Sequence, residues 1–200
     1  MANLIKDLQE ELSTNLIDPR TKESRDWFIQ RVKEITRVDR RELMSEDPLE
    51  LTRRVFPIGR MYMFLYNPIG QETLPYYDRF PVVITVKKLK DGFTGLNLHY
   101  LPLIYRARLL ENLQMVRLNN KRYDETTRFR LTYDILNENN RFRFFRPCFK
   151  RYKMSRIRGN LALIHSSEWE VASYLPVAFF RKRKEPYVHM DSRRIIRENM

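Results

Sequence analysis

The residues best suited to bind another molecule form the stretch 141–158, which reads RFRFFRPCFKRYKMSRIR. Eight arginines or lysines are interleaved there with five phenylalanines or tyrosines, and no acidic residue interrupts them. Arginine and lysine displace counterions from phosphates, and aromatic rings stack on unpaired bases. This composition predicts the binding of an anion, either a phosphate backbone or an acidic face of another protein.

The order of residues within the stretch favours one geometry. In RFRFF a β-strand would place Arg141 and Arg143 on one face and Phe142 and Phe144 on the other. The rings would then pack into the core, and the basic residues would form a stripe above a hydrophobic floor. Such a stripe grips a phosphate backbone without reading its sequence.

A second basic cluster, RKRK at residues 181–184, lies closer to the C-terminus. It matches the loose pattern of a targeting signal, but so many proteins carry such a run that the pattern has little weight. The candidate residues for binding DNA or an acidic partner are Arg141, Arg143, Arg146, Lys150, Arg151, Lys153, Arg156, Arg158, Arg181, Lys182, Arg183 and Lys184.

The positive charge of the chain is unevenly distributed. The formal net charge is +13, of which residues 1–80 contribute −1, residues 81–140 contribute +4 and residues 141–200 contribute +10. A local positive field of this size indicates an acidic partner. Basic faces are also often simply solvated, so nucleic acid, an assembly partner and solvent remain open as explanations.

No set of residues predicts a metal centre or a nucleophile. His99, His165 and His189 are scattered, without the spacing of a metal site, and the single Cys148 cannot form a cysteine cluster. Cys148 follows a proline in a phenylalanine-rich run, where a small buried side chain is the simpler interpretation. We therefore expect no cofactor.

A metal-dependent nuclease is the enzyme class that would suit the charge. Its common core sets an Asp against a strand with Asp/Glu-x-Lys, and no lysine here has an acidic residue two places before it. Asp78 precedes the strand that ends in Lys87, but Thr85 occupies the position of the second carboxylate. No phosphate-binding G-x-x-x-x-G-K-[ST] is present either, so we expect no enzyme.

The elements that must position these residues change in character along the chain. Apolar residues at helical spacing predict helices near residues 4–12 and 22–35, and a third after the N-cap Asp47. From Arg60 the period falls to two: residues 61–66 predict a strand, and residues 82–100 a hairpin that turns at Asp91 and Gly92. A helix from Pro102, a strand over 127–136 and a helix over 166–175 follow.

Helices first, then a small sheet, then mixed structure predict an α+β fold. We expect an N-terminal helical arm at residues 1–57 and a core domain at 58–178 with a small antiparallel sheet or partly open barrel and additional helices. Residues 179–200 should form an extended basic C-terminal tail. One cysteine, no secretory signal and no apolar run of membrane-spanning length predict a soluble protein in a reducing compartment.

Four blocks resemble a family of small virion-associated proteins from T4-like contractile-tailed bacteriophages. They are IGRMYMFLYNP, TLPYYDRFPVVI, DGFTGLNLHYLP and YRARLLENL, and a helix that begins at Ser166 or Ser167, contains Trp169 and leads to Leu175-Pro176-Val177 extends the likeness to residue 178. Members of the family are described as DNA end protectors or as tail and baseplate components. The resemblance implies a non-enzymatic virion protein, assembled in the host cytoplasm, and it supplies no functional residues.

These observations lead to three hypotheses. The first is a structural protein of the neck, tail or baseplate, which holds other virion proteins in a symmetric assembly of many subunits through its arms and basic face. The second is a protein that binds and protects the double-stranded DNA end of the packaged genome. The third is a metal-dependent nuclease or packaging enzyme. None of them involves a membrane.

Overall fold

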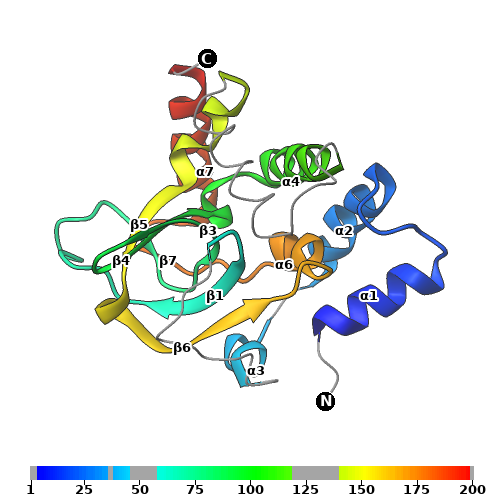
Figure 1. Ribbon diagram of the computed structural model, residues 1–200, viewed down its shortest axis with the longest axis horizontal. Coiled ribbons are helices and arrows are strands. Elements are labelled where there is room, and N and C mark those ends of the chain that lie inside the picture. The colour runs from blue at the N-terminus through cyan, green and yellow to red at the C-terminus, as the bar shows by residue number, and fades with distance from the viewer. Residues whose placement is uncertain (1–3, 36–37, 46–57, 119–139, 199–200) are drawn as a thin grey trace.

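An antiparallel sheet of five strands lies at the centre of the chain (Figure 1). The computed structural model describes residues 4–35, 38–45, 58–118 and 140–198. The order in the sheet is β5-β4-β3-β1-β6, and β2 pairs separately with β7. The strands are β1 Met61–Tyr66, β2 Tyr77–Asp78, β3 Val82–Leu89, β4 Gly92–Asn97, β5 Phe149–Lys153, β6 Ile157–Ile164 and β7 Phe180–Arg181.

The connection between the two edge strands forces this sheet to curl. β5 passes through the short 3-10 helix η3, Met154–Arg156, directly into β6 on the opposite edge. Five flat strands about 4.8 Å apart would separate the edges by roughly 19 Å, and four peptide steps reach only about 14 Å. The ring centroids of Tyr66 on β1 and Tyr152 on β5 accordingly lie 4.9 Å apart, although two strands separate them.

The two faces of the sheet bury different clusters because side chains alternate along each strand. On β1 the residues Tyr62, Phe64 and Tyr66 belong to the concave, aromatic cluster, whereas Met61 and Met63 belong to the larger core. The aromatic cluster is completed by Val83, Phe93, Tyr152 and Leu161.

The larger core is shared between the sheet and the helices. α1, α2, α4 and α6 lie together beside the sheet, and α7 stands at a different end next to the 3-10 helix η2 (Figure 1). The helices are α1 Leu4–Thr14, α2 Lys22–Glu34, α3 Arg40–Ser45, η1 Leu98–Tyr100, α4 Leu103–Leu118, η2 Asn140–Cys148, α6 Trp169–Tyr174 and α7 Glu185–Glu198.

The N-terminal helices are fastened to α6 by a buried carboxylate. Thr21 caps α2 by accepting the Ser24 N–H at 3.1 Å, and the Ser24 hydroxyl donates to Glu170 at 3.0 Å. The Arg20 N–H donates to the same carboxylate at 2.9 Å. Burial raises the pKa of Glu170, and these two donors oppose that shift only in part.

Most of the predicted elements are present. The α+β class is confirmed, as are the first two helices, the strand from Met61, and the hairpin that pairs β3 with β4. The third predicted helix after Asp47 and the strand over 127–136 fall outside the described residues. The division into segments 1–57, 58–178 and 179–200 stays a prediction.

The expectation that RFRFF begins a strand is wrong. Residues 140–148 form the 3-10 helix η2, and the strand β5 starts only at Phe149. Phe144 and Phe145 are nevertheless buried, because 3-10 geometry also turns part of the segment towards the core. The ring of Phe144 is therefore structural, as the strand argument expected, but for a different geometric reason. Phe145, which a strand would place on the face of Arg141 and Arg143, is buried as well.

The expectation of an extended C-terminal tail is also wrong. Residues 185–198 form the helix α7, and its Val188 and Ile196 belong to the larger core. Val188 and Ile196 lie eight positions apart with the buried Ser192 midway, so all three share one face of the helix, and burying that face offsets the cost of ordering the chain. The basic residues 181–184 precede this helix and do not hang from a free end.

Candidate nucleic-acid interface

Two groups of basic residues stand out in the described part of the chain. We call the first the hairpin group, because it surrounds the β3–β4 turn, and the second the β7 group, because it starts in β7. The hairpin group consists of Lys87, Lys88, Lys90, Arg151, Lys153, Arg156 and Arg158. The β7 group consists of Arg181, Lys182, Arg183 and Lys184.

Strand register brings the hairpin group together. Thr94 on β4 pairs with Lys87 on β3 and with Arg151 on β5, so the two basic side chains flank it on one face of the sheet. The Met154 N–H donates to the Asp91 carbonyl at 3.0 Å, which holds η3 and the start of β6 against the turn. Arg156 and Arg158 therefore join a surface that residues distant in sequence have already begun.

Asp91 partly neutralises this surface. Its carboxylate lies 2.9 Å from Arg151 Nη2 and 3.3 Å from Lys153 Nζ. Hydrogen bonds from these two side chains lower the pKa of Asp91. The structure gives no ion pair to Lys87, Lys88, Lys90 or Arg158 within its described ranges, so the group as a whole stays positive.

Lys150 differs from its neighbours. Its ammonium lies 4.1 Å from the centroid of the Tyr100 ring, and its side chain is half-buried. Burial lowers the pKa of Lys150. Of the sequence-based candidates on β5, Lys150 is thus the least suited to contact a partner, whereas Arg151 and Lys153 are accessible.

The remaining candidates from the 141–158 stretch belong to η2. Arg146 is exposed on η2, next to α7. The side chains of Arg141 and Arg143 fall outside what the structure describes. Sequence reasoning missed the three lysines of the hairpin group, although VKKLKDG at the predicted turn could have indicated them.

The β7 group is held in place along its whole length. β7 pairs with β2, with Tyr77 opposite Arg181 and Asp78 opposite Phe180. Lys182 has a φ of +68°, a conformation that non-glycine residues rarely adopt. Its ammonium donates to the carbonyls of Glu72 at 2.7 Å and Leu74 at 3.1 Å, which fixes this strained turn.

Aromatic rings accompany the β7 group. The Arg183 guanidinium lies 5.7 Å from the Tyr76 ring centroid and 5.9 Å from that of Tyr187, and it pairs with Asp191 at 2.7 Å. Three other guanidinium groups surround the ring of Phe179, at distances between 5.1 and 5.9 Å; they belong to Arg40, Arg79 and Arg181.

Two shallow hollows flank Phe180 and Lys182, which line both. The first, of about 370 Å³, is completed by Gln71, Glu72, Tyr77 and Arg181. The second, of about 440 Å³, is completed by Ala178, Phe179, Arg183, Lys184 and Glu185. Both volumes fall within the roughly 300–1,000 Å³ typical of small-ligand sites.

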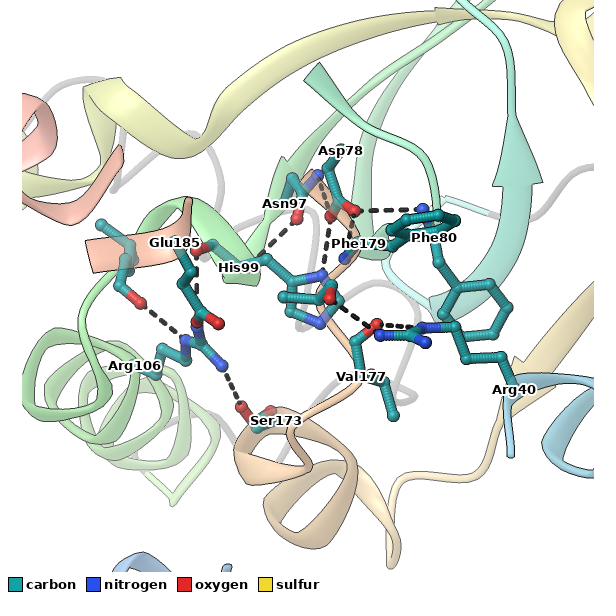
Figure 2. Close-up of polar contacts among 12 residues, drawn as sticks. Arg40, Asp78, Phe80, Asn97, His99, Arg106, Ser173, Val177, Phe179 and Glu185 are labelled. Atoms are coloured by element: carbon teal, nitrogen blue, oxygen red, sulfur yellow. Dashed lines mark hydrogen bonds and ion pairs between the residues drawn. The ribbon is translucent and has the colours of Figure 1, made fainter. Parts of the chain in front are cut away.

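A buried polar network centred on Asp78 holds the backbone that leads into the β7 group (Figure 2). Asp78 Oδ1 accepts the backbone N–H groups of Phe80 at 3.0 Å and Phe179 at 3.2 Å. Its Oδ2 accepts from Asn97 at 3.1 Å and lies 2.7 Å from His99 Nδ1. Burial disfavours ionisation, but these contacts outweigh it, so the pKa of Asp78 lies below its ordinary value.

Two arginines extend this network to either side (Figure 2). Arg106 is fully buried and donates to the carbonyls of Leu101 at 2.6 Å and Ser173 at 3.1 Å, and to Glu185 at 3.1 Å. Burial lowers the pKa of Arg106. Arg40 donates to the carbonyls of Val177 and Ala178, at 2.8 and 2.9 Å. The chain is thereby fixed both before and after the β7 group.

The residues that the sequence analysis considered for catalysis are Asp78, Cys148 and the three histidines, and most of them are buried and hydrogen-bonded within the fold. Asp78 is enclosed in the network just described, and no cluster of metal-ligating side chains occurs within the described ranges. Cys148 is buried and donates to the Phe145 carbonyl, and burial raises the pKa of its thiol to about 12. His165 is exposed, His99 is buried, and His189 Nε2 lies 2.9 Å from the His99 carbonyl.

The chain connecting β1 to β3, residues 67–81, borders both basic groups. Its Asn67 N–H donates to the Arg156 carbonyl at 3.1 Å, and its Glu72 and Leu74 carbonyls hold Lys182. This one segment thus contacts a member of each group, Arg156 of the hairpin group and Lys182 of the β7 group.

Comparison with known proteins identifies the family of the chain. Within the described residues, no helix has the length and apolar character needed to span a bilayer. No curated protein and no solved structure shows significant similarity to the chain. A sequence model of the family described as phage T4 terminal DNA protecting protein matches residues 2–195. With nearly its whole length covered, the chain belongs to the phage T4 terminal DNA protecting protein family.

Proposed function

We propose that this chain binds the ends of the packaged phage genome and shields them from exonucleases without catalysing a reaction. The observation that carries this proposal is the exposed positive surface formed by the hairpin group and the β7 group. The family is described as a terminal DNA protecting protein, which names the same kind of partner. It supports the DNA-end hypothesis better than the neck, tail or baseplate hypothesis that the sequence alone placed first.

The hairpin group suits the backbone of a duplex. Apart from Phe149, the aromatic rings of β1, β4 and β5, including Phe64, Phe93 and Tyr152, lie inside the curled sheet and cannot reach bases. What remains accessible is mainly ammonium and guanidinium groups, which bind phosphates and carry no sequence information. A protein that protects any end of a genome requires such sequence-independent contacts.

The rigidity of both groups supports the same proposal. Asp91 orients Arg151 and Lys153, and Lys182 is fixed by two backbone carbonyls. Basic residues that are already positioned lose less side-chain freedom when phosphates arrive. The interface is therefore built to bind a large anion, in contrast to a solvated surface whose charged side chains move independently.

Competition between DNA forms tests the proposal. The purified chain is bound to a fluorescent linear duplex and challenged with equal masses of unlabelled linear or covalently closed circular DNA of the same sequence. We expect linear DNA to compete more strongly as the fragments are shortened and ends become more numerous. Equal competition by linear and circular DNA at every fragment length would show general DNA binding and would contradict binding to DNA ends.

A further inference from the structure

The two basic groups differ in one respect that bears on the form of DNA each can hold. The hairpin group keeps its neighbouring rings inside the sheet, apart from Phe149, which is 37% exposed. The β7 group lies among half-buried or exposed rings of Tyr76, Phe179, Phe180 and Tyr187. Rings contribute nothing to gripping the shaft of a duplex, where bases are stacked inside, but they do bind unpaired bases.

We propose that the two hollows beside Phe180 hold an unpaired terminal nucleotide of the DNA end, with its base against aromatic side chains and its phosphate on the β7 group. This inference rests on the proposed end-binding function and specifies its ligand. The unpaired nucleotide comes either from a single-stranded extension or from fraying of the last base pair of a blunt end.

The lining of the hollows has the chemistry that such a ligand needs. Arg181 borders the first hollow and Lys184 the second, and neither has a carboxylate partner among the described residues. Phe180 lies between the hollows, with its ring 5.1 Å from that of Tyr100 and perpendicular to it, so its position is fixed by packing. A fixed ring between two hollows can separate a terminal base from the stack.

Polar side chains in the first hollow add hydrogen-bonding groups. Gln71 accepts the Tyr77 hydroxyl at 2.9 Å through Oε1, which leaves its amide nitrogen as a donor for a base edge. The second hollow is lined by the basic side chains of Arg183 and Lys184, and the guanidinium groups of Arg40, Arg79 and Arg181 surround the ring of Phe179 at its wall. Base contacts are thus available in the first hollow, and phosphate contacts on both sides of Phe180.

The geometry of the site does not depend on the ligand. Asp78 and Arg40 hold the backbone at Val177–Phe179, and the β2–β7 pairing and Lys182 hold the residues that follow. The hollows are consequently formed in the free chain, as in most small-ligand sites. Binding a terminal nucleotide therefore requires no rearrangement of this segment.

The test uses three DNA duplexes, each closed by a hairpin loop at one end. The other end is blunt with a terminal G·C pair in the first duplex and carries a few additional unpaired nucleotides in the second. In the third duplex it is closed by a second loop. Binding is measured by anisotropy at matched salt. We expect the extended end to bind about tenfold more tightly than the blunt end, in line with the energy of one stacked base. Arg181→Ala and Phe180→Leu should remove this preference.

Arg158→Ala is the matched control, since it removes the same charge from the hairpin group. It should weaken binding to blunt and extended ends by the same factor and so preserve the preference. Thermal unfolding checks that the Phe180→Leu variant is folded. If that variant is unfolded, the test rests on Arg181→Ala, which changes an exposed side chain. A preference that survives in both variants would assign the unpaired nucleotide to another surface and overturn the proposal.

A second readout separates the two sources of the nucleotide. In a second blunt duplex, whose terminal pair is a fluorescent adenine analogue opposite thymine, the analogue brightens when it leaves the stack. Equal affinity for blunt and extended ends, with brightening that Phe180→Leu abolishes, identifies fraying as the source. Equal affinity without brightening overturns this inference alone, whereas equal binding to open and closed ends overturns the end-binding function itself.

Discussion

His99 Nδ1 lies 2.7 Å from Asp78 Oδ2, and both side chains are 1% exposed. Through its other oxygen Asp78 also accepts the Phe179 N–H, so one carboxylate joins η1, the start of β3 and the segment that leads into β7. An Asp beside a His at the edge of a sheet invites interpretation as a catalytic pair. Here the pair is enclosed, and its evident role is to position the β7 group.

The first prediction concerns this carboxylate. Asp78→Ala should lower the free energy of unfolding by roughly 3–5 kcal/mol, because buried His99, Asn97 and two backbone N–H groups lose their acceptor. Urea unfolding followed by circular dichroism measures the change. Asp78→Asn, which keeps one acceptor oxygen, should cost less. Wild-type stability in Asp78→Ala would contradict the network.

The second prediction concerns Glu170 and pH. Its folded-state pKa is raised above the ordinary 4.5, so protonation favours the folded state and stability should rise as pH falls from neutral towards 4.5. Glu170→Gln should flatten that rise, whereas the exposed Glu23→Gln should keep it. Thermal unfolding across this pH range measures the effect. An unchanged pH profile in Glu170→Gln would contradict the assignment.

The pKa of Asp78 is shifted in the opposite direction from that of Glu170, so the two carboxyl groups affect the pH dependence of stability in different ways. Its folded-state pKa lies below the ordinary 3.8, so its stabilisation is present above that pH and is lost as pH falls through the lower value. Acid unfolding should therefore begin below about pH 4. Asp78→Asn is expected to lessen the dependence of stability on pH in that acidic window only.

The third prediction concerns α7. Ile196 is 1% exposed, so Ile196→Ala should lower the free energy of unfolding by roughly 2–5 kcal/mol, whereas the neighbouring exposed Arg197→Ala should change it by less than about 0.5 kcal/mol. Urea unfolding compares the pair. If both variants matched the wild type, residues 185–198 would behave as the extended tail that the sequence suggested.

The fourth prediction separates two basic residues of similar sequence context. Lys150→Met should leave DNA affinity and its salt dependence unchanged, because the Lys150 ammonium is half-buried against Tyr100. Arg158→Met should weaken binding and reduce the slope of log affinity against log salt by about 0.9, the loss of one phosphate contact. Anisotropy titrations at several salt concentrations measure both slopes. Equal slopes would contradict the assignment of the hairpin group.

Sequence reasoning succeeded where structure is local. The hairpin of β3 and β4 was predictable because alternating residues flank Asp91 and Gly92, and Gly92 is required since a side chain there would meet the Tyr152 carbonyl at 1.9 Å. The strand β6 was missed, because Gly159 and Asn160 interrupt its apolar pattern and its partner β1 lies about a hundred residues earlier.

The candidate site shows the same division. Residues 181–184 were nominated from composition, and the structure places them on a fixed segment. Their support was not predictable: Asp78 contacts Asn97 and Phe179, which are 19 and 101 positions away, and no periodicity encodes such pairs. RFRFF was wrongly assigned to a strand because its pattern is too short. A pattern of five residues does not distinguish a strand from a 3-10 helix.

The most direct measurement of end protection follows the degradation of a linear duplex by a processive double-strand exonuclease. The wild-type chain should lengthen the lifetime of the duplex, and rising salt should shorten it again. Arg181→Glu combined with Lys184→Glu should abolish protection, whereas Lys22→Glu, an exposed reversal on α2 outside both groups, should retain it. Degradation at the same rate with and without the wild-type chain would contradict the account.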